Sequence, residues 1–257
     1  MKPPHRTFIL IFAAVTTAVL TTIVTLRGQG QAGQKGALLD NRQQKEEFES
    51  QFPVTDFDSQ EPAGIDERNL RRRKSSRYDN NHLVNKGDAS SDATESVFFD
   101  ERDSALPAAP SSQSEVILVG NVADARAYVS NDKTGVYSEF NVTIEETLKN
   151  RSSMPLVVNS AVSLEREGGA VRYPSKGKYL YRISGQGMPR VGRRYVFFLK
   201  ATDPQQNFRI ITAYELRGGK IYPLDSAEQF DAYKGADAAK FLNALKNAIA
   251  HPETELN

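Results

Sequence analysis

The chain has 257 residues, of which 33 are Lys or Arg and 32 are Asp or Glu, so its formal net charge is +1 at neutral pH. This balance does not support sequence-independent binding of nucleic acid, which needs a concentrated basic surface. The chain contains no Cys, which excludes disulfides, thiolate metal ligands and Cys nucleophiles. Its three His residues, His5, His82 and His251, are far apart in the sequence, so we predict no catalytic residues, no cofactor and no metal site.

The N-terminal 26 residues have the pattern of a membrane anchor. Residues 1–6 contain Lys2 and Arg6, and residues 7–26 contain no charged side chain. Because about 20 apolar residues cross a bilayer as a helix, we predict a transmembrane signal anchor at residues 7–26. The basic start places residues 1–6 in the cytoplasm and the rest outside, as a single-pass protein of the cell membrane. The alternative is a cleaved signal peptide and a secreted or periplasmic protein, for which Gln31-Ala32-Gly33 is a poor cleavage site.

Residues 27–112 are predicted to be a disordered tether. They carry 12 basic and 16 acidic residues and few apolar ones, too few to offset the entropy of ordering the chain. The basic cluster Arg71–Arg77 within them has three interpretations: contact with anionic lipid or an acidic polymer, a protease-sensitive site, or a solvated charge run. We predict the solvated charge run.

A folded domain is predicted at residues 113–224. Gly and Asn-Asp turns divide it into five to seven short strands, the first with Gly120 as a bulge or a close backbone approach. In the clearest strand Phe140, Val142 and Ile144 alternate with polar residues, which is typical of an antiparallel sheet with one solvent-exposed face. The dense apolar run Tyr195–Leu199 is predicted to fill the core. The other strands are expected at residues 115–122 (resuming through 126–129), 156–166, 179–183, 208–214 and 220–224.

Residues 225–257 form a predicted C-terminal helical segment. Asp225 or Ser226 is expected to cap a first turn near residues 227–233. A stronger helix is expected at residues 236–250, where six apolar residues form one stripe: Ala238, Phe241, Leu242, Leu245, Ala248 and Ile249. The fold class is therefore mainly β: a small antiparallel OB-like β-barrel with a C-terminal amphipathic helix, one N-terminal transmembrane helix and a disordered linker.

Four stretches in order resemble the bacterial netrin-like, or tissue-inhibitor-of-metalloproteinase-like, domain: residues 116–122, residues 145–150, Pro189–Leu199 and residues 208–222. The resemblance covers about residues 114–224 and implies an OB-type five-stranded barrel with an extracytoplasmic binding role. The animal inhibitors use an N-terminal Cys and disulfides, which this chain lacks. We therefore do not predict that this chain inhibits metalloproteinases.

The predicted function is a membrane-anchored, extracytoplasmic, non-catalytic binding or scaffold module whose partner is an envelope protein or polysaccharide. OB-type barrels bind through one face and its loops, and Tyr side chains beside cations suit sugars or acidic groups. The alternative is a protein that binds single-stranded nucleic acid or polysaccharide, although the anchor argues against nucleic acid. The candidate binding surface consists of Arg172, Tyr173, Lys178, Tyr181, Arg182, Arg190, Arg193 and Arg194.

A hydrolase would need two carboxylates that converge on one substrate. Glu145 and Glu146 are adjacent in a strand and point to opposite faces. Glu165 and Glu167 share a side, but they precede Gly168-Gly169 and are predicted to lie at a wet strand end. We therefore predict that the chain is not an enzyme.

Overall fold

A computed structural model describes residues 50–82, 84, 95–98, 106–150, 155–174, 177–202 and 207–251. The chain divides into two compact units, residues 1–50 and 51–257, and all the described residues except Ser50 belong to the second. The predicted anchor at residues 7–26 and the cytoplasmic residues 1–6 lie outside the described residues. Within the described ranges, no helix combines the length and apolar character needed to cross a membrane.

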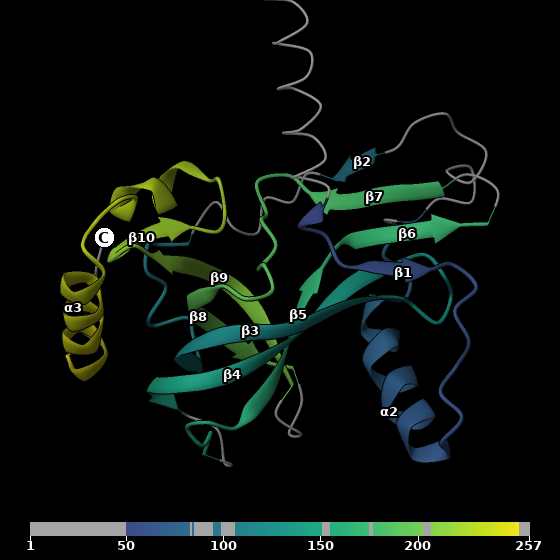
Figure 1. Cartoon of the computed structure of the whole chain (residues 1–257), viewed down its shortest axis with the longest axis horizontal. Coiled ribbons are helices and arrows are strands. Elements are labelled where there is room, and N and C mark those ends of the chain that lie inside the picture. Colours follow the sequence, from purple (N-terminus) through teal and green to yellow (C-terminus); the bar gives the residue numbers. More distant parts are fainter. Residues whose placement is uncertain are drawn as a thin grey trace, which may run out of the picture. The chain divides into compact units, whose positions relative to one another are not determined.

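The larger of two sheets confirms the prediction of a mainly β, antiparallel fold (Figure 1). Strand β3 pairs antiparallel with β4 and β8, β4 pairs with β5, and β8 pairs with β9. Strand β9 also pairs antiparallel with β10 and, over three residues, parallel with β5. The strands are β3 (Val116–Val129), β4 (Val136–Asn150), β5 (Ala161–Glu167), β8 (Arg194–Ala201), β9 (Asn207–Arg217) and β10 (Lys220–Pro223).

The side chains of β4 and β8 show how this sheet is built. Phe140, Val142 and Ile144 alternate along β4 and are fully buried in the first apolar cluster, as predicted. Strand β8 is buried on both faces: Tyr195, Phe197 and Leu199 enter the same cluster, while Val196 and Phe198 enter a second one on the opposite face. The predicted core role of Tyr195–Leu199 is confirmed. Strand β5 begins later than expected, at Ala161, and leaves Val157 and Val158 exposed.

Gly120 allows β3 and β4 to approach closely. The pairing register shifts between Val119 and Gly120, which confirms the predicted bulge. A Cβ atom at position 120 would lie 2.5 Å from Val142 Cγ1 and 2.7 Å from the carbonyl oxygen of Thr143. Only Gly fits there without a shift of the neighbouring strand.

The C-terminal helix α3 (Ala238–Ala250) packs into the second apolar cluster through Phe241 and Leu245, and it also buries Ala248, as its stripe predicts. The Asp237 carboxylate caps it by accepting a hydrogen bond from the Lys240 N–H at 2.9 Å. The expected caps at Asp225 or Ser226 are wrong: the 3₁₀ helix η4 (Glu228–Tyr233) follows Ala227 and has no side-chain cap. Asp225 is instead buried in an ion pair.

The second sheet was only partly predicted. Its antiparallel centre is β6 and β7, and β1 and β2 pair with them in parallel at the two edges. Its Tyr-rich face forms a third apolar cluster with residues of β3 and β4. The strands are β1 (Val54–Asp56), β2 (Glu95–Phe98), β6 (Gly169–Tyr173) and β7 (Gly177–Ile183).

The prediction of a disordered tether therefore does not hold for residues 51–82, 84, 95–98 and 106–112. Besides β1 and β2, they contain the helix α2 (Ile65–Ser75), continued by the 3₁₀ helix η1 (Ser76–Tyr78). Phe52 is buried in the first apolar cluster, and Tyr78 is buried as well. These segments are ordered by partners far along the chain, which local composition does not register.

Candidate functional site

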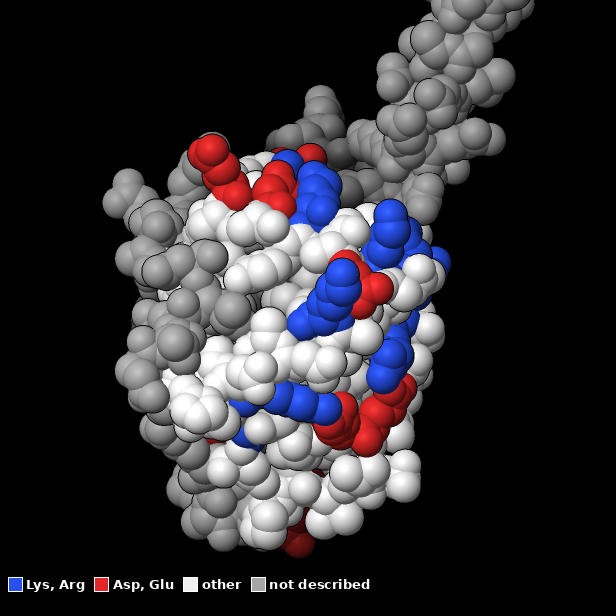
Figure 2. Space-filling model, turned by 90° about the vertical axis from the view of Figure 1, so that its left-hand side faces the viewer, with Lys and Arg blue, Asp and Glu red and all other residues white. Residues whose placement is uncertain are grey.

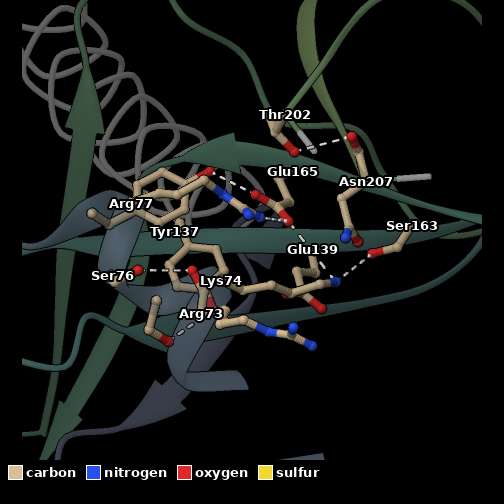
Figure 3. A network of polar contacts seen from close by, with 12 residues as sticks. Arg73, Lys74, Ser76, Arg77, Tyr137, Glu139, Ser163, Glu165, Thr202 and Asn207 are labelled. Atoms are coloured by element: carbon tan, nitrogen blue, oxygen red, sulfur yellow. Dashed lines mark hydrogen bonds and ion pairs between the residues drawn. The ribbon is translucent and has the colours of Figure 1, made fainter. Parts of the chain in front are cut away.

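The outer face of β4 and β5 carries two adjacent carboxylates. Glu139 and Glu165 are direct cross-strand partners, and Glu165 is fully buried. Like charges directly opposite each other on a sheet destabilise it. Cations supplied by α2 and η1, which lie on this face, compensate for them (Figure 3).

The sequence of α2 and η1 places three cations on one side. Arg71, Lys74 and Arg77 are three residues apart, and residues at this spacing lie on the same helix face. Asp66 and Glu67 in the first turn and Arg72, Arg73 and Lys74 in the last turn match the helix dipole. The only buried residues of α2 are Lys74 and Ser75, so α2 has no apolar face with which to bind the sheet.

Arg71 makes the best-defined contact with the acidic face. Its Nη1 and Nη2 donate to Glu139 Oε1 and Oε2 at 2.5 and 3.3 Å, and its guanidinium carbon lies 3.4 Å from the ring centre of Tyr128. Burial opposes the charge of the guanidinium, but the hydrogen bond and charge of Glu139 outweigh burial. The pKa of Arg71 is therefore raised above its usual value.

Lys74 and Arg77 complete the neutralisation. Lys74 Nζ lies 3.3 Å from Glu139 Oε1 and 3.8 Å from Glu165 Oε1, and it donates to Ser163 Oγ at 3.4 Å. Arg77 Nη2 donates to Glu165 Oε1. Lys74 is thus held by two carboxylates and by the hydroxyl of Ser163.

Two tyrosines form the aromatic part of the site. The rings of Tyr78 and Tyr137 stack at 4.2 Å between centres, and the Tyr78 hydroxyl donates to Glu165 Oε2 at 3.1 Å. Burial, and then the charge of Glu165, raises the pKa of Tyr78 well above its usual value. Burial also raises the pKa of Tyr137 to about 12, although Arg71 acts in the opposite direction.

The loop between β3 and β4 contacts α2 and the residues that follow η1. Asp132 accepts hydrogen bonds from the Asn80 N–H at 2.7 Å, the Ser130 hydroxyl at 2.7 Å and the Thr134 N–H at 3.0 Å. Its slight burial opposes ionisation, but these hydrogen bonds outweigh burial, and the pKa of Asp132 is well below its usual value. The Asn131 side chain also donates to the Arg72 carbonyl oxygen at 2.9 Å.

Two hollows flank α2. An open groove of about 490 Å³ is lined by Lys74, Tyr128, Glu139, Asn141 and Ser163, among others. A more enclosed pocket of about 260 Å³ lies between the connection from β1 to α2 and the end of the β3–β4 hairpin. The larger groove thus leaves the acidic face accessible beside Glu139.

The candidate surface predicted from the sequence is not brought together. Arg172, Tyr173, Lys178, Tyr181 and Arg182 lie on β6 and β7 of the smaller sheet, whereas three of the arginines lie at or just before the start of β8 in the larger one: Arg190, Arg193 and Arg194. The two tyrosines are buried and their hydroxyls are hydrogen-bonded to each other at 2.6 Å. They belong to the third apolar cluster, so their rings do not present a stacking surface to solvent.

Four of these arginines form local ion pairs. Arg172 contacts Asp56 at 3.0 Å, Arg193 contacts Glu215 at 3.7 Å and Arg194 contacts Glu145 at 2.5 Å. Arg182 pairs with Glu95. Each of these four side chains is thus paired with a different carboxylate.

The carboxylates that a hydrolase could have used contact different partners. Glu145 contacts Arg194, whereas Glu146 contacts Lys246 on α3. The expectation of a wet strand end is wrong for Glu165, which α2 and η1 cover completely. In the part of the chain that the structure describes, no cluster of His, Cys, Asp or Glu has the arrangement of a metal site.

The basic cluster Arg71–Arg77 holds the residues that the sequence interpretation missed. A solvated charge run describes Arg72 and Arg73, which are exposed, but it is wrong for Arg71, Lys74 and Arg77. The three-residue spacing of those cations was the available signal. Comparison of the chain with protein-family models and with curated protein sequences gives no match.

Proposed function

We propose that the chain is a non-catalytic binding or scaffold module, built on an OB-type barrel and held outside the cytoplasm by a membrane anchor at residues 7–26. Its ligand is a cationic segment, and its binding site is the outer face of β4 and β5 with the loop between β3 and β4. The observation that carries this proposal is the buried carboxylate of Glu165, with two hydrogen-bond donors and a third, cationic side chain of one segment gathered around it.

The strand pairings support the OB-type barrel. The pairings β3–β4, β4–β5, β5–β9, β9–β8 and β8–β3 form a ring in which only β5–β9 is parallel. OB-folds are five-stranded Greek-key barrels that bind ligands on the face of their second and third strands and on the adjoining loops. The second and third strands of this ring are β4 and β5. The same ring supports the proposed relationship to netrin-like domains.

The charge of the face supports a cationic ligand over nucleic acid. Proteins that bind single strands without sequence preference align cations and exposed aromatic rings along a groove. Here the strand face carries Glu139 and Glu165, and its ring, Tyr137, is already stacked on Tyr78. On the face around α3, Lys and Arg side chains lie beside Asp and Glu and are separated by uncharged surface (Figure 2).

The test uses the full chain in detergent micelles. A labelled lysine-rich peptide, a single-stranded oligonucleotide and an anionic polysaccharide are titrated separately, with fluorescence anisotropy as the readout. Of the three ligands, we expect only the peptide to bind, and its affinity should fall as salt is added. Carbodiimide coupling then joins peptide lysines to the carboxylates they touch, and we expect adducts at Glu139 or Glu165. Binding of the oligonucleotide without the peptide, or adducts scattered over exposed carboxylates such as Glu228, would contradict the proposal.

A further inference from the structure

The segment that covers the acidic face is attached differently from the rest of the fold. None of the residues 65–78 belongs to any of the three apolar clusters. The clusters take Phe52, Phe57 and Val84 from the flanking chain, so the sheets are packed without α2. The helix even exposes Ile65 and Leu70 to solvent.

What holds the segment in place is polar. Arg71, Lys74 and Arg77 pair with Glu139 and Glu165, and Tyr78 adds one ring stack and one hydroxyl hydrogen bond. The Ser75 hydroxyl lies 3.0 Å from that of Tyr137. Ion pairs contribute little net stability when their groups can return to water. Detachment of residues 65–78 would return Glu139 and Glu165 to water together with their cationic partners. The apolar surface that it would expose is the Tyr78–Tyr137 stack, which lies outside the three apolar clusters.

We propose that residues 65–78 are a displaceable intramolecular ligand, and that the face beneath them binds a cationic segment of a partner protein. This inference rests on the function proposed above and specifies its ligand. The partner segment presents Arg or Lys at three-residue spacing followed by an aromatic residue, the pattern of Arg71, Lys74, Arg77 and Tyr78. Such a segment reproduces the two hydrogen bonds from a guanidinium to Glu139, the cations beside Glu165 and the aromatic ring stacked on Tyr137.

Competition between residues 65–78 and the partner segment sets the affinity for the partner. A ligand for a site that is open only part of the time binds more weakly in proportion to the open fraction. The internal segment is also present at the high effective concentration of a tethered ligand. Loosening α2 should therefore strengthen binding in trans, which is the reverse of what is expected if α2 were part of the receptor surface.

The test compares three forms of the full chain in detergent micelles: the wild type, an opened variant and a matched control. The opened variant is Arg71→Glu/Lys74→Glu, which reverses two cations that face Glu139. The control is Arg72→Glu/Arg73→Glu, the same charge change on the exposed side of the same helix. The probe is a fluorescent peptide with the sequence of residues 65–78, and hydrogen exchange monitors α2 and the barrel strands.

We expect the opened variant to lose protection in α2 but keep it in β3 and β8, and to bind the peptide at least about tenfold more tightly than the wild type and the control. Should the variant fail to fold, exchange of the wild type at low and high salt replaces it. Protection of α2 should then fall with salt while that of α3 does not.

Three results would overturn the inference. The first is unchanged protection of α2 in the opened variant or at high salt. The second is a variant with an exposed α2 that does not bind the peptide, or a wild type that binds it equally well. The third is a wild-type dimer that exchanges residues 65–78 between copies, which would make the partner a second copy of this chain. If the lysine-rich peptide still binds to Glu139 and Glu165, the proposed function survives each of these failures.

Discussion

Replacement of Asp225 should destabilise the fold more than most substitutions, because Asp225 balances a buried charge. Arg166 Nη2 donates to Asp225 Oδ1 at 2.5 Å, and both side chains are almost completely buried. The same carboxylate accepts hydrogen bonds from the Gly187 N–H at 2.9 Å and the Thr212 hydroxyl at 2.8 Å. Arg166 Nε and Nη1 are buried and have no hydrogen-bond partner among the described residues, so the guanidinium depends on this one carboxylate.

The magnitude follows from what Asp225→Ala leaves behind. Removal of one partner of a buried ion pair costs about 3–5 kcal/mol, because the remaining charge is left uncompensated. A domain is typically stable by about 5–15 kcal/mol, so the variant should lose a large part of its free energy of unfolding. A double replacement, Arg166→Met/Asp225→Ala, removes the charge as well and should recover much of this loss.

Urea unfolding of the full chain in detergent, followed by far-UV circular dichroism, measures these differences. The matched control is Asp231→Ala, which removes an exposed pair with Lys234 at 3.1 Å and should change stability by less than about 1 kcal/mol. If Asp225→Ala stays within about 1 kcal/mol of the wild type, or the double variant is as unstable as the single one, the reasoning about an uncompensated charge is refuted.

Three further predictions concern single positions. Gly120→Ala should destabilise the chain by about 1–3 kcal/mol in the same urea assay, since its Cβ would press on Val142 and on the backbone of the next strand. Asp237→Ala should cost about 1 kcal/mol and increase hydrogen exchange in the first turn of α3, because it removes the N-cap. Burial raises the pKa of both Tyr137 and Tyr195 to about 12, above the unfolded value near 10, so the stability they contribute is complete below about pH 10 and is lost as the pH rises through about 12. Urea midpoints measured across this range should fall, and the fall should be smaller in Tyr195→Phe.

The elements that were predictable from the sequence are those whose own side chains create the apolar surface. The alternation of Phe140, Val142 and Ile144 determines which face of β4 is inside, and the stripe of α3 determines which side of the helix packs. Gly120 was recognisable because an isolated Gly inside a strand needs a local reason. In each case the information lies within a few residues of the element itself.

The charged elements could not be placed in this way. Arg71 contacts Glu139, and Arg77 contacts Glu165, across 68 and 88 residues of sequence. Neither end of such a pair identifies the other, and a basic run with no apolar face has the composition of a solvated segment. The prediction that Tyr173 and Tyr181 lie on a binding surface was wrong for a related reason. Both tyrosines are buried in the third apolar cluster, beside residues of β3 and β4. Their burial depends on the smaller sheet, and two of its four strands lie in the predicted tether.

The two helices that flank the larger sheet are therefore held by different forces. Helix α3 buries Phe241, Leu245 and Ala248, and this attachment does not weaken as ions are added. Helix α2 buries only Lys74 and Ser75 and depends on ion pairs, whose groups are screened once water reaches them. A helix with only a structural role would be held more firmly by an apolar stripe of the kind that α3 has. The absence of such a stripe from α2, which covers the buried carboxylate of Glu165 instead, is what favours a ligand-like role for this helix over a scaffolding one.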